Sequence, residues 1–237
     1  MILYIIRHGQ STNNALAGET NRTCDPELTE TGGRQAALLA AYLAHGALPE
    51  FEYGMAATCR EAGCGITRLF VSPMRRALQT AQPVAQALGL QPEVWVELHE
   101  HGGVFLDHGP EIGVVGYPGL TRAEMEAQFP GYVLPQEVGL RGWWAGGRED
   151  RTGCDARAAR VAATLRSWAT RDERIALISH GDFLDALLKA LLRPLAGHGC
   201  YFLHLNTAVT RAELRGDGHV EVGFLNRTDH LPPETVT

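Results

Sequence analysis

The residues best suited to chemistry in this sequence are two histidines, each of which follows a short apolar run and is itself followed by glycine. His8 comes after residues 1–6, and His180 comes after residues 175–178 and a serine. Apolar runs of this length, rich in β-favouring residues, predict buried strands. Because ligands of open α/β sheets bind at the carboxyl ends of the strands, we expect the two titratable side chains to meet across one crevice.

Strands and helices alternate around these histidines. The predicted strands are residues 1–6, 69–71, 94–98, 175–178, 202–206, 208–214 and 220–225. The predicted helices are one with Thr29 as N-cap, one with Ser72 as N-cap and Pro73 at its first position, and residues 156–170 and 183–192. This order predicts an α/β fold, a three-layer sandwich with a mostly parallel sheet, at least one antiparallel strand, and helices on both faces.

Residues 99–155 interrupt the alternation with a segment rich in glycine and proline. Its one visible helix follows Thr121, which together with Glu124 has the form of a capping box. The segment contains nine acidic residues, four arginines and no lysine. We expect it to be an irregular lid inserted into a single domain that spans residues 1–237, with residues 46–66 as a surface excursion.

Composition excludes several classes of function. The 237 residues are 45% apolar, which suffices for a large packed core, and the formal net charge is −6. An acidic chain is a poor partner for nucleic acid or for an anionic membrane. No apolar stretch has membrane-spanning length, and residues 1–6 lack the basic region of a signal peptide. The five cysteines are irregularly spaced, as expected of reduced thiols, so we predict a cytoplasmic protein.

Four ordered blocks of residues connect this chain to a known family. They are Arg7-His8-Gly9-Gln10 with Asn14, Leu28-Thr29 with Gly32, Ser72-Pro73 with Arg76-Ala77 and Gln79-Thr80-Ala81, and Ser179-His180-Gly181. Together they closely resemble the histidine phosphatase superfamily of phosphoglycerate mutase-like enzymes, over residues 1–100 and 156–210. The resemblance implies phosphoryl transfer through a phosphohistidine, a small phosphorylated substrate, no cofactor and no metal.

The resemblance also implies the roles of five side chains. His8 is the expected nucleophile, and Arg7, Arg76 and His180 are the expected cage around the phosphoryl oxygens. Physical chemistry supports these roles, because phosphoryl transfer needs an in-line nucleophile and fixed cations or donors around the oxygens. Glu100, just after the predicted strand 94–98, is the expected acid for the leaving oxygen. Burial or nearby negative charge would have to raise its pKa.

Further residues at the same sheet edge are expected to bind the substrate. They are Gly9, Gln10, Asn14, Gly181 and Asn206. The Asn14 amide can donate a hydrogen bond, and the helix after Ser72 directs its dipole toward an anion. Two charged neighbours are given other roles: Arg75 is expected in solvent or in a salt bridge, and Asp182 is expected to cap the following helix rather than to act as a second acid.

Two alternatives concern the lid. His99, Glu100, His101 and His108 invite a metal-site interpretation, since His-x-His on a strand directs both rings to one face. No further ordered set of ligands completes such a site, so a metal is not predicted. Trp143 and Trp144 could contact an organic leaving group, but we favour a place in the lid's own core.

Hydrolysis is favoured over mutase action. The phosphoglycerate mutases of the superfamily carry an aromatic, Gly-Trp and Asp run where residues 20–25 keep only Asp25, and Arg-His-Tyr-Gly where His101-Gly102-Gly103 follows Glu100. The clustered cations of the lid are Arg141, Arg148 and Arg151, so a bisphosphate gains little there. We predict a phosphomonoester hydrolase. A mutase is the alternative, a non-catalytic module that binds a phosphorylated ligand is a third option, and a homodimer is left open.

Overall fold

A computed structural model describes residues 1–18, 21–46, 63–192 and 199–237. Within these residues the main feature is a sheet of order β3-β2-β6-β1-β7-β8. The parallel strands are β1 (Ile2–Arg7), β2 (Arg68–Val71), β3 (Glu93–Val94) and β6 (Arg174–Ser179). The strands β7 (Val209–Leu214) and β8 (Val220–Arg227) are antiparallel to their neighbours. The predicted α/β class with a mostly parallel sheet is confirmed.

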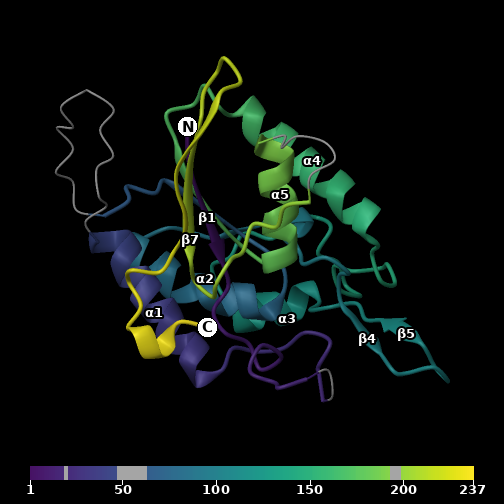
Figure 1. Ribbon diagram of the computed structural model, residues 1–237. Coiled ribbons are helices and arrows are strands. Elements are labelled where there is room, and N and C mark those ends of the chain that lie inside the picture. The colour runs from purple at the N-terminus through teal and green to yellow at the C-terminus, as the bar shows by residue number, and fades with distance from the viewer. Residues whose placement is uncertain (19–20, 47–62, 193–198) are drawn as a thin grey trace, which may run out of the picture.

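Helices pack on both faces of this sheet because its central strands are buried on both sides (Figure 1). In β1, Tyr4 and Ile6 belong to the apolar cluster that includes residues of α1 (Glu30–His45) and α2 (Arg75–Leu88). Leu3 and Ile5 belong to the cluster on the other face, which includes residues of α4 (Arg151–Ser167) and α5 (Gly181–Leu192). An apolar run without polar alternation is typical of such a strand. Within the described part of the chain, no helix is long and apolar enough to cross a membrane.

Of the three predicted N-caps, two are confirmed and one is wrong. The Thr29 hydroxyl accepts a hydrogen bond from the Gly32 amide, and Thr121 forms a full capping box with Glu124 at the start of α3 (Arg122–Gln128). In contrast, α2 begins at Arg75 with Met74 as its N-cap, so Ser72 and Pro73 lie before the helix. The Ser72 hydroxyl lies 2.7 Å from a ring nitrogen of His180 instead.

Other predicted boundaries also differ from the structure. Strand pairing in the predicted strand 94–98 stops after Val94, and the chain continues as a 3-10 helix, η1 (Val96–Leu98). Residues 202–206 are irregular: Leu203 is 55% exposed, and the Asn206 amide donates to a carbonyl near the C-terminus instead of to a strand. Helix α4 begins five residues earlier than predicted, because Asp150 caps it by accepting from the Gly153 amide. Most of the predicted surface excursion 46–66 lies outside the described residues.

Residues 99–150 contain more regular structure than predicted. Besides α3, they form a hairpin of β4 (Phe105–Asp107) and β5 (Val114–Gly116), which extends away from the main sheet (Figure 1). Trp143 is buried and its ring centroid lies 5.9 Å from that of Trp144. Trp143 belongs to the apolar cluster that also includes α1 and α2, and the partly buried Trp144 packs against it, so the expected separate core of the lid is instead continuous with the core on that face of the sheet. The chain ends near a short 3-10 helix, η2 (Pro233–Thr235).

Candidate active site

The ends of β1 and β6 place the two histidines side by side. Arg7 pairs with Ser179 across the parallel ladder, so His8 and His180 each stand one residue beyond the same rung. Their ring centroids are 5.0 Å apart, and both side chains are buried. The two histidines therefore lie side by side at the carboxyl edge of the sheet, as predicted.

Hydrogen bonds fix the protonated nitrogen of His8. The His8 Nδ1 atom lies 2.6 Å from the Gly9 carbonyl oxygen, which can only accept, so Nδ1 carries the hydrogen of the neutral ring. The Nε2 atom then carries no hydrogen, and its lone pair accepts a hydrogen bond from Arg76 Nε at 3.1 Å. His8 thus directs an unprotonated nitrogen toward a guanidinium group.

Burial keeps both histidines neutral. It lowers the pKa of His8 well below the ordinary 6.5, and the positive charges of Arg76 and Arg7 lower it further. The pKa of His180 is also lowered well below 6.5, mainly by burial and then by Arg76. Neutral imidazoles at neutral pH can supply a lone pair or a hydrogen-bond donor, depending on the tautomer.

Arg76 is held by a carboxylate that sequence reasoning did not place in the site. The Arg76 guanidinium lies 3.8 Å from Asp25, which is itself about 90% buried and also accepts the Arg75 amide hydrogen. Burial raises the pKa of Asp25, and the charge of Arg76 opposes that rise. Arg75 forms a 3.2 Å salt bridge with Glu27, which agrees with its predicted place.

Arg7 and the backbone of His8 are held by the irregular segment 202–207. Arg7 donates from Nη1 to the His204 carbonyl at 2.7 Å, while its Nε has no hydrogen-bond partner among the described residues. The Asn206 side-chain amide donates to the His8 carbonyl at 2.9 Å, and the Thr207 amide donates to the Arg7 carbonyl. In the structure, Asn206 therefore holds the His8 backbone instead of facing a ligand.

Glu100 lies at the N-terminus of α5, the helix that begins directly after His180. Its carboxylate accepts from the amides of His101 at 2.8 Å and Phe183 at 2.9 Å, and more weakly from Asp182 at 3.4 Å. Burial raises the pKa of Glu100 above the ordinary 4.5 and the negative charge of Asp182 raises it further, although the amides and Arg76 act in the opposite direction. A carboxyl group of this kind can hold a proton at a higher pH than usual.

The predicted capping role of Asp182 is wrong. Glu100 takes the free amides at the start of α5, and Asp182 accepts instead from the Tyr201 hydroxyl at 2.8 Å. Tyr201 is 56% exposed. The Tyr201 hydroxyl raises the pKa of Arg7, and the charge of Glu100 raises the pKa of Tyr201. Asp182 and Tyr201 therefore stand at the outer side of the cluster.

A buried arginine positions the backbone just before Glu100. Arg157 is 3% exposed and donates from Nη1 to the carbonyls of Glu97 at 2.7 Å and His99 at 2.8 Å. Its other nitrogens form a bidentate pair with Glu149, at 3.0 and 2.6 Å. Arg157 thus links α4 to both ends of the segment 99–150.

The remaining predicted binding residues line the loop after β1 and the start of α5. Gln10 donates its amide hydrogen to Gln35 and accepts from the Thr29 hydroxyl. Asn14 uses its side-chain oxygen to accept from Ser11, and its side chain is otherwise exposed. A Cβ added at Gly181 would lie 3.6 Å from Arg7 Nε. These contacts place Gly181 beside the cage and give Gln10 a part in the loop's own structure.

Gly9 is a position of close backbone approach, and Gly9→Ala is expected to destabilise the protein. An added Cβ would lie 2.6 Å from the Gly32 carbonyl oxygen, so the backbone must shift, at a cost of about 1–3 kcal/mol. Urea unfolding measures the change. Gly33→Ala is the matched control, because nothing lies within 4 Å of its added Cβ and alanine favours the helix by up to about 1 kcal/mol. Equal effects of the two substitutions would contradict this account.

The lid histidines form no metal cluster among the described residues, where no group of three or more His, Cys, Asp or Glu side chains could hold an ion. The His99 ring packs 4.8 Å from Trp144 and its Nδ1 contacts the Val96 carbonyl. The exposed His108 contacts the Tyr117 hydroxyl at 2.9 Å. The rings of His99 and His108 therefore have different environments.

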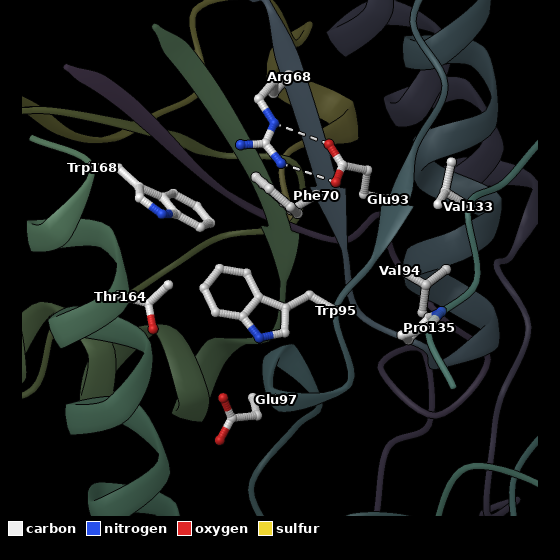
Figure 2. A pocket seen from close by; sticks show the side chains of 10 residues that line it. All are labelled: Arg68, Phe70, Glu93, Val94, Trp95, Glu97, Val133, Pro135, Thr164 and Trp168. Atoms are coloured by element: carbon white, nitrogen blue, oxygen red, sulfur yellow. Dashed lines mark hydrogen bonds and ion pairs between the residues drawn. The ribbon is translucent and has the colours of Figure 1, made fainter. Parts of the chain in front are cut away.

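A separate hollow of about 420 Å³ lies against β2, β3 and α4. Figure 2 shows the rings of Phe70, Trp95 and Trp168 gathered on one side of it, while Arg68 donates two hydrogen bonds to Glu93. The Phe70 and Trp168 rings stack at 5.6 Å, and the Arg68 guanidinium lies 4.5 Å from the Phe70 ring. None of the side chains of the histidine cluster lines this hollow.

Sequence reasoning missed three residues that support the site. Ser72 contacts His180, Asp25 pairs with Arg76, and the fully buried Gln35 accepts from the Gln10 amide while donating to the carbonyl of Thr235 at 2.7 Å. The sequence could have indicated the first two, because Ser72 belongs to one of the ordered blocks and Asp25 lies shortly before another. The contact with Thr235 joins residues 200 apart, and no local pattern reveals it.

Comparison with protein-family models gives a match along most of the chain. A family model described as the histidine phosphatase superfamily (branch 1) matches residues 3–227. The PE-PGRS family protein PE_PGRS11 of Mycobacterium tuberculosis is 33% identical over 117 residues. These residues are 49% of this chain but 17% of that relative, so the chain spans a small part of its length.

Solved structures resemble the chain over nearly its full length. A mycobacterial glucosyl-3-phosphoglycerate phosphatase in complex with VO3 is 24% identical, with a TM-score of 0.58, and the match covers 96% of this chain and 99% of that one. A phosphoserine phosphatase mutant from Entamoeba histolytica in complex with phosphoserine is 20% identical, with the same TM-score and coverage of 98% and 99%. At these identities the two structures establish a shared fold.

Proposed function

Because the chain belongs to the histidine phosphatase superfamily (branch 1), we propose that it hydrolyses phosphomonoesters of small metabolites through a phosphohistidine at His8. The observation that carries the proposal is the state of the His8 ring. Its Nδ1 hydrogen is engaged by the Gly9 carbonyl, and its Nε2 lone pair faces the buried guanidinium of Arg76. A neutral imidazole held in this way is a nucleophile that needs no separate base.

The first step transfers the phosphoryl group to the enzyme. His8 Nε2 attacks phosphorus, the bond between phosphorus and the ester oxygen breaks, and Glu100 gives its proton to the leaving oxygen. Arg7, Arg76 and the neutral His180 hold the three other oxygens, where negative charge is concentrated. The unpartnered Nε of Arg7 and Nδ1 of His180 support this role, since buried polar groups are normally hydrogen-bonded.

The second step returns the enzyme to its starting state. Glu100, now a carboxylate, takes a proton from water as that water attacks phosphorus, and the bond to His8 Nε2 breaks. The products are an alcohol and inorganic phosphate. Asn14 adds a donor to the anion site in this proposal. Its oxygen is committed to Ser11, so its NH₂ group is left for a ligand.

The leaving group is proposed to contact residues 99–155, which act as a lid. The segment begins at the proposed acid Glu100 and returns to the core at α4, so it borders the oxygen that receives the proton. The matched structures include phosphatases for glucosyl-3-phosphoglycerate and phosphoserine by title. A small hydrophilic alcohol is accordingly the leaving group we propose for this chain. Cytoplasmic location and metal independence stay predictions, and a homodimer stays open.

Two of the three clustered arginines of the lid, Arg148 and Arg151, are already engaged, which favours hydrolysis over mutase action. Arg151 contacts Asp155 at 2.9 Å and Asp185 at 3.0 Å, and the Arg148 guanidinium lies 5.0 Å from the Phe105 ring. Charges already paired with carboxylates or stacked on rings add little to the binding of a bisphosphate.

We expect phosphate release from an aryl phosphate and negligible isomerisation of 3-phosphoglycerate. The enzyme is incubated with the aryl phosphate, and separately with 3-phosphoglycerate plus its bisphosphate primer, with and without exhaustive chelation of metals. Efficient formation of 2-phosphoglycerate with negligible phosphate release would establish the mutase alternative. Acid quenching with labelled substrate tests for a phosphoenzyme. Binding without any trapped label would instead indicate a non-catalytic module.

A further inference from the structure

Ser72 is a buried serine whose hydroxyl meets the second histidine of the site. It follows β2, its side chain is fully buried, and its Oγ lies 2.7 Å from His180 Nε2. The backbone amide of Ser72 donates to the Ile178 carbonyl, which fixes the serine beside the end of β6. The short contact is therefore between two groups whose positions are both set by the sheet.

The hydrogen of this contact belongs to one of the two groups. The Met74 amide donates to Ser72 Oγ at 3.3 Å, so that oxygen already accepts one hydrogen bond and has one hydrogen to give. Among the described residues, His180 Nε2 is the acceptor in contact with it, and His180 Nδ1 is buried without any partner. A neutral imidazole carries its hydrogen on only one of these nitrogens.

The two tautomers leave different groups unsatisfied. If Nε2 carried the hydrogen, it would donate to Ser72, whose own hydrogen would lack an acceptor, and the Nδ1 lone pair would also be unmatched. If Nδ1 carries the hydrogen, Ser72 donates to Nε2 and only the Nδ1 hydrogen is left without a partner. Because each unpaired buried polar group costs stability, the second tautomer is favoured.

We propose that Ser72 is a positioning residue, which holds His180 in the tautomer with its hydrogen on Nδ1 so that this nitrogen donates to a phosphoryl oxygen. The inference rests on the proposed function for the identity of the acceptor, but the tautomer itself belongs to the free protein. Ser72 acts through His180 and does not touch the substrate. A serine that only filled space at this position would leave the tautomer unchanged when it is replaced.

The tautomer is measured directly by nuclear magnetic resonance on protein with ¹⁵N-labelled histidine. Two-bond proton–nitrogen correlations distinguish the two tautomers, and loss of the signal in His180→Gln assigns it. We expect the hydrogen on Nδ1 in the wild-type protein and a mixture of tautomers, or the reverse one, in Ser72→Ala. A wild-type hydrogen on Nε2 overturns the proposal, as does an unchanged tautomer in Ser72→Ala. If that variant does not fold, the wild-type spectrum alone decides.

Ser179→Ala is the matched control, because it also removes a fully buried hydroxyl next to His180. The Ser179 hydroxyl donates to the Leu98 carbonyl at 2.6 Å and does not contact the ring, so the wild-type tautomer is expected. In turnover, Ser72→Ala is expected to lower kcat by about tenfold to a hundredfold, with Ser72→Thr restoring part of the loss. Retention of full kcat in Ser72→Ala would overturn the stated role of the Nδ1 hydrogen.

These readouts separate this inference from the proposed function. An inactive protein whose His180 tautomer depends on Ser72 would leave the inference on the free protein standing and refute the phosphatase proposal. If phosphohistidine forms in a protein whose His180 carries its hydrogen on Nε2, the phosphatase proposal stands and the inference about Ser72 is refuted.

Discussion

His8→Ala is expected to lower the hydrolysis of phosphomonoesters by about ten-thousandfold or more. The substitution removes the nitrogen whose lone pair faces Arg76, so the proposed covalent intermediate cannot form. Phosphate release and acid-quench trapping of labelled enzyme should both fall to the background level. Circular dichroism and urea unfolding should show that the fold is retained.

The control for this prediction is His219→Ala. His219 lies exposed in the turn between β7 and β8, and the substitution removes an imidazole without touching the cluster. Its turnover should equal that of the wild-type protein. Substantial phosphate release by a folded His8→Ala protein would show that the nucleophile is another residue.

Glu100→Gln is expected to have an effect that depends on the leaving group. The amide keeps an oxygen for the backbone amides of His101 and Phe183 but cannot give a proton, so kcat for an alkyl phosphate should fall by about a hundredfold to ten-thousandfold. With an activated aryl phosphate the first step needs little acid assistance. Slow hydrolysis of the phosphohistidine should then produce a burst of aryl alcohol. Stopped-flow absorbance and steady-state phosphate release measure the two cases.

The pH profile follows from the same groups. Glu100 must be protonated to act as an acid, so activity is lost as pH rises through its pKa, and because that pKa is raised above 4.5 the loss moves toward neutral pH. His8 must be unprotonated, so activity is lost as pH falls through its pKa, which lies well below 6.5. Glu100→Gln should abolish the alkaline limb for an alkyl phosphate. Glu97→Gln, at a partly exposed partner of Arg160, should keep the wild-type profile, and a matching loss there would contradict the assignment.

The architecture was predictable where the local pattern agrees with the tertiary structure. Continuous apolar runs indicated the buried strands β1 and β6, and the Thr29 and Thr121 caps indicated two helix starts. Prediction failed where tertiary contacts overrule local preference. Residues 94–98 look like a strand but turn into a 3-10 helix after two residues, and Ser72 turns its hydroxyl toward His180 instead of capping α2. The strands of the β4–β5 hairpin are three residues each, too short for a clear periodicity.

The site was predictable to the extent that its residues follow strands directly. His8 and His180 are adjacent because parallel neighbours end at one edge. The ordered blocks implied Arg76, and the family resemblance implied Glu100 from its place just after residues 94–98. The supporting contacts depend on segments far apart in sequence. The Asn206 amide that holds the His8 carbonyl, for example, comes from 198 positions later in the chain, from a segment that the pattern wrongly marked as a strand.

The pairing of Arg157 with Glu149 limits how this fold can be recombined. Arg157 belongs to α4, but the carboxylate that pairs with it, that of Glu149, comes from residues 99–150, and the arginine is 3% exposed. Consider a chimaera in which residues 99–150 are replaced by the corresponding loop of a homologue. The Arg157 guanidinium would then be buried without its carboxylate partner unless the incoming loop carried an acidic residue at the same place. A buried charge that loses its partner costs about 3–5 kcal/mol of stability. Residues 99–150 are therefore not energetically independent of the helix that follows them. The incoming loop must carry an acidic residue at the position of Glu149.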